Sequence, residues 1–111
     1  MTKILVVRDE TIKQIEITGH AGFAQKGEDI VCAGISSLSF AAGMALERYK
    51  IPAEIKQDVK QTAFAIIPKW SEMTEEQTLR TETILQSLVW ALEDLADSYQ
   101  KYVKLDTVRR C

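Results

Sequence analysis

Residues 30–49 form an almost continuous apolar segment, which constrains the fold more than any other feature of the chain. Charges appear only near its end, at Glu47 and Arg48. Asp29 precedes the segment and can cap a helix through its carboxylate, and Pro52 follows it and stops a helix. A helix that is apolar all round is buried on most faces, in a core or against a partner. The sequence therefore predicts a helix over residues 30–49 that is covered on most sides.

Four segments of strand-like composition flank this helix in two pairs. Residues 3–8 are rich in β-branched and aliphatic side chains, and residues 11–18 alternate imperfectly between apolar and polar ones. The acidic pair Asp9-Glu10 between them predicts a turn, so we expect a hairpin. Residues 53–59 and 62–67 predict a second hairpin by the same pattern.

The last third of the chain predicts a second long helix. Thr74 followed by Gln77 fits a capping box, in which the two side chains bond each other's backbone amides. Residues 103–110 are expected to form a closing strand. The order is then ββαββα with a last β, which favours a single α+β domain with a mostly antiparallel sheet. Along this second helix, apolar residues recur every three or four positions and form one stripe: Leu85, Leu88, Leu92, Leu95, Tyr99 and Tyr102.

Composition limits the classes of function. A chain of 111 residues makes one domain, over residues 1–111, and 46% hydrophobic with 27% charged residues is typical of a soluble globular protein. A net charge of −2 argues against direct nucleic-acid binding over a broad surface. We expect no membrane span, because we find no apolar run near the roughly 20 residues that a span needs. Two cysteines make no disulfide framework, so the reducing cytosol is the expected compartment.

The chemistry of the chain gathers around one glycine-rich loop. His20 is the only histidine and Cys32 is one of two cysteines, and all five glycines lie between Gly19 and Gly43. If Asp29 caps the first helix, Cys32 lies in its first turn, where helix amides and a nearby imidazolium favour the thiolate. His20 could take the thiol proton and return it to a leaving amine, and first-turn amides could hold an oxyanion.

Each of these residues also has a purely structural interpretation. Cys32 could fill a core, because cysteine is among the most buried residue types. His20 could be a surface or capping residue, and Asp29 a helix cap and nothing more. Ser36 lies four residues after Cys32 on the same helix face, where it could bond the sulfur or the Cys32 carbonyl, or simply pack. The sequence offers too few ligands for structural zinc and no nucleotide-binding glycine pattern, so we expect no metal and no cofactor.

The order and spacing of these residues resemble the ribosomal-processing cysteine protease family, known as Prp. The family pattern is Gly-His-Ala, a short variable loop, Gly-x-Asp-Ile-Val-Cys-Ala, and a serine four residues after the cysteine. One departure is Gly34, where the family more often has alanine, and from the sequence this affects only helix stiffness. The matching residues here are Gly19-His20-Ala21, Gly27-Glu28-Asp29-Ile30-Val31-Cys32-Ala33 and Ser36.

The resemblance implies a bacterial, cytoplasmic and dimeric enzyme that removes a short N-terminal extension from a large-subunit ribosomal protein. It implies Cys32 as nucleophile and His20 as base, with Asp29 and Ser36 in support. It also implies that the loop over residues 21–28 is mobile and lies near the substrate peptide. That substrate region comprises Gly19, Ala21, Gly22, Phe23, Gly27 and Glu28.

Two other functions fit the same residues. In a non-enzymatic, dimeric, ribosome-associated adaptor, the apolar first helix would be an interface and the loop only a turn. In a small redox sensor, Cys32 would need a resolving thiol, for which Cys111 at the end of the chain is the one other cysteine. Fast alkylation of Cys32 at neutral pH would favour the protease over a packed, structural cysteine.

Overall fold

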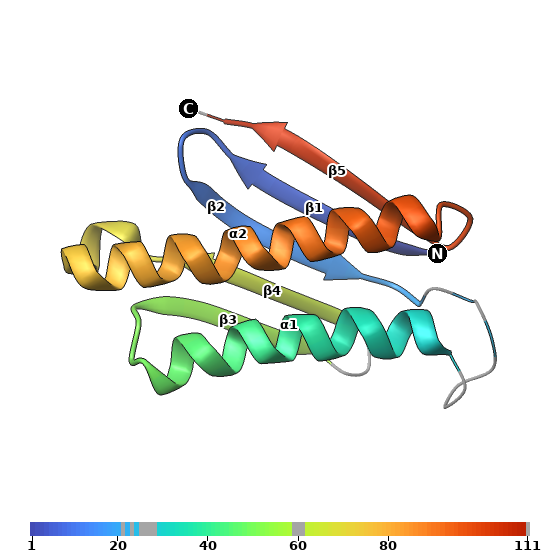
Figure 1. Cartoon of the computed structure of the whole chain (residues 1–111), viewed down its shortest axis with the longest axis horizontal. Helices are drawn as coiled ribbons and strands as arrows, with labels where there is room; N and C mark the ends of the chain where they lie inside the picture. The colour runs from blue at the N-terminus through green and yellow to red at the C-terminus, as the bar shows by residue number, and fades with distance from the viewer. Residues whose placement is uncertain (21, 23, 25–28, 59–61, 111) are drawn as a thin grey trace.

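A computed structural model describes residues 1–20, 22, 24, 29–58 and 62–110. Two helices lie on the same side of a five-stranded sheet (Figure 1). The predicted ββαββαβ order is confirmed, and apart from the end of α2 the element ends differ from the predicted ones by about one residue. The elements are β1 Thr2–Arg8, β2 Ile12–Thr18, α1 Ile30–Arg48, β3 Ala53–Asp58, β4 Ala63–Pro68, a 3-10 turn Trp70–Glu72, α2 Glu75–Ser98 and β5 Val103–Arg109.

The strand order is β3-β4-β2-β1-β5, and only the β1–β5 pair is parallel. Strands β4 and β5 run in the same direction, so a tight turn cannot join them, and α2 provides the long crossover from β4 to β5 at the edge of the sheet. The expected α+β fold with a mostly antiparallel sheet is therefore confirmed.

The core lies between one face of the sheet and the two helices. The sheet face is built by register, because Ile4 pairs with Ile17 and Val6 pairs with Ile15, which pairs in turn with Ile66. All of these isoleucine and valine side chains are buried. The helices meet them with a second set of buried side chains, which includes Val31, Ile35, Leu46, Leu85, Leu88 and Leu92.

Helix α1 is covered on one side only. Ile30, Phe40 and Met44 on its other side are 61%, 44% and 52% exposed. The expectation that this helix is buried on most faces is therefore wrong for the single chain. The expectation of no span-length apolar run is also wrong, because by length and composition alone α1 could cross a membrane. Its buried side, however, packs in the core, as in the central helix of a globular domain.

Helix α2 begins as predicted and ends earlier. The Thr74 side chain accepts from the Gln77 amide, and the Gln77 side chain accepts from the Thr74 amide, which completes the capping box. Leu85, Leu88 and Leu92 of the predicted stripe are buried. The helix stops at Ser98, because the carbonyl of Tyr99 accepts from the amides of Tyr102 and Val103 and turns the chain into β5. Tyr99 is thus the C-cap, so the predicted continuation of the helix to Tyr102 is wrong, although Tyr102 still packs against the core.

Helices α1 and α2 pack closely at Gly34. A Cβ atom added at Gly34 would lie 3.3 Å from Cδ1 of Leu95 on α2. That separation is tighter than ordinary van der Waals contact, so Gly34 has a packing role beyond the effect on helix stiffness expected from the sequence.

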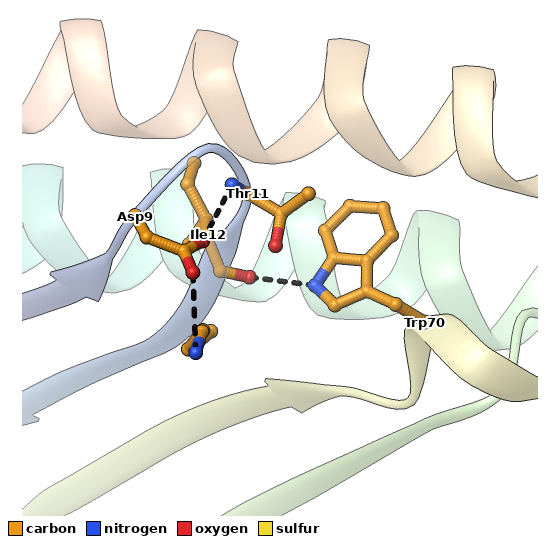
Figure 2. A network of polar contacts seen from close by, with 5 residues as sticks. Asp9, Thr11, Ile12 and Trp70 are labelled. Carbon is orange, nitrogen blue, oxygen red and sulfur yellow. Dashed lines mark hydrogen bonds and ion pairs between the residues drawn. The ribbon is translucent and has the colours of Figure 1, made fainter. Parts of the chain in front are cut away.

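The β1–β2 turn is fixed by polar contacts (Figure 2). Asp9 Oδ1 accepts from the Thr11 amide at 3.1 Å, and Oδ2 lies 3.3 Å from Lys13 Nζ. The Trp70 indole donates to the Ile12 carbonyl at 2.9 Å. The hydrogen bond from Thr11, followed by the contacts with Lys13, holds the pKa of Asp9 below its usual value. The turn that the acidic pair predicted is therefore confirmed.

Candidate active site

Asp29 organises the first turn of α1. Its Oδ1 atom accepts hydrogen bonds from the amides of Val31 and Cys32, both at 3.0 Å, and its carbonyl accepts from Ala33 at 3.0 Å. Asp29 is therefore the predicted N-cap, and Cys32 is the third residue of α1. The amides of Val31, Cys32 and Ala33 thus already donate hydrogen bonds within the helix start. A contact between first-turn amides and a developing oxyanion stays a prediction.

Gly19 directs the chain out of β2 and sets the position of His20. Its φ of +85° is left-handed, and a Cβ atom there would lie 2.6 Å from the Met1 carbonyl oxygen. The Gly19 amide donates to the carbonyl of Thr62 at 3.0 Å, and the Thr2 hydroxyl donates to the Gly19 carbonyl at 3.4 Å. Only glycine combines this backbone angle with so close an approach of another backbone.

The imidazole of His20 is exposed, and its Nε2 atom lies 2.9 Å from Oγ1 of Thr62. Thr62 comes directly before β4 and has a φ of +51°, an outlier for a β-branched residue. Thr62 is a partner of His20 that the sequence did not reveal. It lies 42 positions from His20, and no local pattern connects the two.

The loop between His20 and Asp29 is described only at Gly22 and Ala24, both of which are exposed. Gly22 has a φ of +73°, and a Cβ atom there would meet nothing within 4 Å. Ala21, Phe23, Gly27 and Glu28 lie outside the described residues, so their place in a substrate loop stays a prediction.

Ser36 lies on α1 one turn beyond Cys32, and both side chains are half-buried. A hydrogen bond from Ser36 to the sulfur or to the Cys32 carbonyl stays a prediction. Among the described residues, no group of three or more His, Cys, Asp and Glu side chains could hold a metal ion.

The end of β2 and the start of α1 lie at the same end of the molecule (Figure 1). Hydrogen bonds join Asp29 to Cys32 on one side of the loop and His20 to Thr62 on the other. The thiol at the helix start and the imidazole after the strand thus lie at the same end of the molecule, and they are the two groups that a thiolate nucleophile and its base require.

Comparisons with known proteins support this interpretation. The family described as Cysteine protease Prp matches residues 1–104. The Ribosomal processing cysteine protease Prp of Mycoplasma pneumoniae is 31% identical over 97 residues, which cover 87% of this chain and 89% of the relative. The protein of the same name from Bacillus subtilis is 28% identical over 102 residues, covering 89% of this chain and 88% of the relative.

A solved structure has the same fold. The essential ribosomal processing protease Prp from S. aureus, crystallised with a covalently linked product peptide, superposes with a TM-score of 0.84. The match covers 96% of this chain and 99% of that protein at 23% identity.

Proposed function

The chain belongs to the Prp family of cysteine proteases, and from that premise we propose that it removes a short N-terminal extension from a bacterial large-subunit ribosomal protein. Residues 1–111 act as one protease domain in the cytoplasm, without a cofactor and without direct nucleic-acid binding. The observation that carries the proposal is Cys32 in the first turn of a helix capped by Asp29, at the end of the molecule where His20 leaves the sheet.

Cys32 is the nucleophile and His20 the base. As the Cys32 sulfur attacks the scissile carbonyl, its S–H bond breaks and the proton passes to the imidazole. His20 then gives this proton to the leaving amine, which departs as the new N-terminus of the substrate. Water hydrolyses the thioester that remains on Cys32 and releases the short extension. Asp29 supports this chemistry by holding the Cys32 backbone in place.

The loop over residues 21–28 closes over the bound peptide and holds it against Cys32. Support comes from its composition, because glycines at positions 22 and 27 can act as hinges for the segment that includes Phe23. Closure only on the correct peptide would protect other cytoplasmic proteins from cleavage.

The active form is a homodimer that pairs through α1. Support comes from the exposed stripe formed by Ile30, Phe40 and Met44, large apolar residues that the chain itself leaves about half exposed. Ala33, Ser37 and Ala41 are exposed along the same stripe and would let a second helix approach closely. An adaptor would use the same surface, but membership of a protease family favours the enzyme.

Two measurements test the proposal. Incubation with the ribosomal precursor, followed by mass spectrometry, should find one new N-terminus. Iodoacetamide should alkylate Cys32 within minutes at neutral pH in the native protein, as read from the mass of the Cys32 peptide. An intact precursor together with slow alkylation would favour the adaptor, and a Cys32–Cys111 disulfide under mild oxidation would favour the redox sensor.

A further inference from the structure

Thr62 makes two hydrogen bonds to the segment that follows β2. Its carbonyl accepts the Gly19 amide at 3.0 Å, and its hydroxyl oxygen lies 2.9 Å from Nε2 of His20. Thr62 is itself fixed by the next residue, since Ala63 is the first residue of β4 and pairs with Thr18. His20 and Gly19 are therefore both bonded to Thr62, which lies directly before β4 and 42 positions after His20 in the sequence.

The backbone of Thr62 is strained. A φ of +51° is uncommon for any residue with a Cβ atom and is an outlier for a β-branched one. Glycine or asparagine would occupy this position at lower cost, yet neither supplies a hydroxyl group. Strain of this kind persists where the surroundings impose it, and it clusters at functional sites. The hydroxyl on the imidazole is the feature that threonine adds here.

We propose that Thr62 is the positioning residue of the catalytic histidine. This inference rests on the proposed role of His20 as the base. The Thr62 hydroxyl accepts a hydrogen bond from Nε2–H, which selects the tautomer whose unprotonated nitrogen is Nδ1. Nδ1 is then the atom that takes the proton from Cys32. When it does, Nε2–H still donates to Thr62, so the imidazolium keeps its orientation and its charge is stabilised.

Two substitutions at position 62 distinguish the effect of the hydroxyl group from the effect of side-chain shape. Thr62→Val keeps the β-branch and makes the same demand on the backbone, but it has no hydroxyl. Thr62→Ser keeps the hydroxyl. We expect Cys32 alkylation at neutral pH to slow by about ten- to a hundredfold in Thr62→Val, as for the loss of one hydrogen bond to a charged group. The midpoint of the pH–alkylation curve should move to higher pH, and Thr62→Ser should restore both values.

A second variant without the hydroxyl keeps the test usable if Thr62→Val does not fold. Thr62→Gly takes away the hydroxyl and also relieves the left-handed backbone, so it should fold even if Thr62→Val does not. It should show the same loss of Cys32 reactivity while its thermal midpoint stays at or above that of the wild-type protein. Wild-type alkylation rates in folded Thr62→Gly or Thr62→Val would overturn the inference.

The His20→Ala background separates this inference from the proposed function. If Thr62 acts through His20, adding Thr62→Val to His20→Ala should slow alkylation no further. An additional slowing of the same size would show that Thr62 acts otherwise and would overturn the inference. A slow His20→Ala variant beside a normal Thr62→Val variant refutes only the role of Thr62. A His20→Ala variant that reacts like the wild-type protein refutes His20 as the base, and this inference with it.

Discussion

At the scale of the residue, the site depends on two glycines whose backbone conformation disfavours any side chain. Gly19 and Gly22 both have a left-handed φ, yet only Gly19 lies against another part of the backbone. The Met1 carbonyl and the Thr62 carbonyl both lie close to it. Gly19 therefore fixes the direction in which the chain leaves β2. At Gly22 only the left-handed φ requires glycine.

This difference predicts unequal losses on substitution. Gly22→Ala should destabilise the fold by about 1–2 kcal/mol, the usual cost of a left-handed alanine. Gly19→Ala should cost about 1–3 kcal/mol more, because its Cβ atom would lie 2.6 Å from a backbone oxygen that cannot move aside. Urea denaturation gives both free energies of unfolding. Equal losses at the two positions would show that β1 yields to the new methyl group.

The dyad makes a second prediction at this scale. Cys32→Ala and His20→Ala should each lower the processing rate by orders of magnitude, because base and nucleophile act as one unit. The double variant should be scarcely slower than either single one. Single-turnover rates measured with folded variants check this, and losses that multiply would contradict the dyad.

At the scale of the element, local patterns predicted most of the structure. The Thr74–Gln77 capping box and the Asp29 cap fixed two helix starts, because a cap involves residues only two or three positions apart. The partner of His20 could not be predicted in this way. The sequence pattern predicts that Thr62 begins a strand, and only the pairing of β2 with β4 brings it to the imidazole. The early end of α2 was missed for a similar reason, since the turn into β5 depends on hydrogen bonds beyond the apolar stripe.

The β1–β2 turn gives a pH-dependent prediction. The pKa of Asp9 in the folded protein lies below its usual value of 3.8, so its ionised form stabilises the fold. That contribution is fully present above the unfolded pKa and is lost as the pH falls through the folded one. Asp9→Asn should therefore be less stable than the wild-type protein at pH 7, and the difference should vanish near pH 2. Denaturation of both proteins at both pH values tests this. A stability difference that persists in acid would show that the effect comes from side-chain shape and not from the carboxylate charge.

At the scale of the whole molecule, two helices cover one face of the sheet (Figure 1), and α1 leaves a stripe of apolar side chains exposed. Stripes of large exposed apolar residues usually mark a partner surface. The sequence predicts that α1 lies either in the core or at an interface. In the structure, one side of α1 packs in the core and the other side is exposed. The apolar run alone could not predict that division, because it depends on where α2 and the sheet lie.

Dimerisation through α1 can be tested with a matched pair of variants. Sedimentation at micromolar concentration should report about twice the 12.5 kDa of one chain. Met44→Lys, on the exposed side of α1, should yield monomers, because it would place a charge within the apolar contact. Leu79→Lys, at a 65% exposed position on α2, should leave the dimer intact. A wild-type monomer, or equal effects of the two variants, would contradict an α1 interface.

The proposed function depends on Cys32 cutting a ribosomal precursor. The most direct measurement incubates the precursor of a large-subunit ribosomal protein with the wild-type protein and with folded Cys32→Ala, and determines the product mass in each case. We predict one product in the wild-type reaction, shortened at its N-terminus, and an intact precursor with Cys32→Ala. Equal cleavage by both proteins, or an intact precursor with both, would contradict the proposed function.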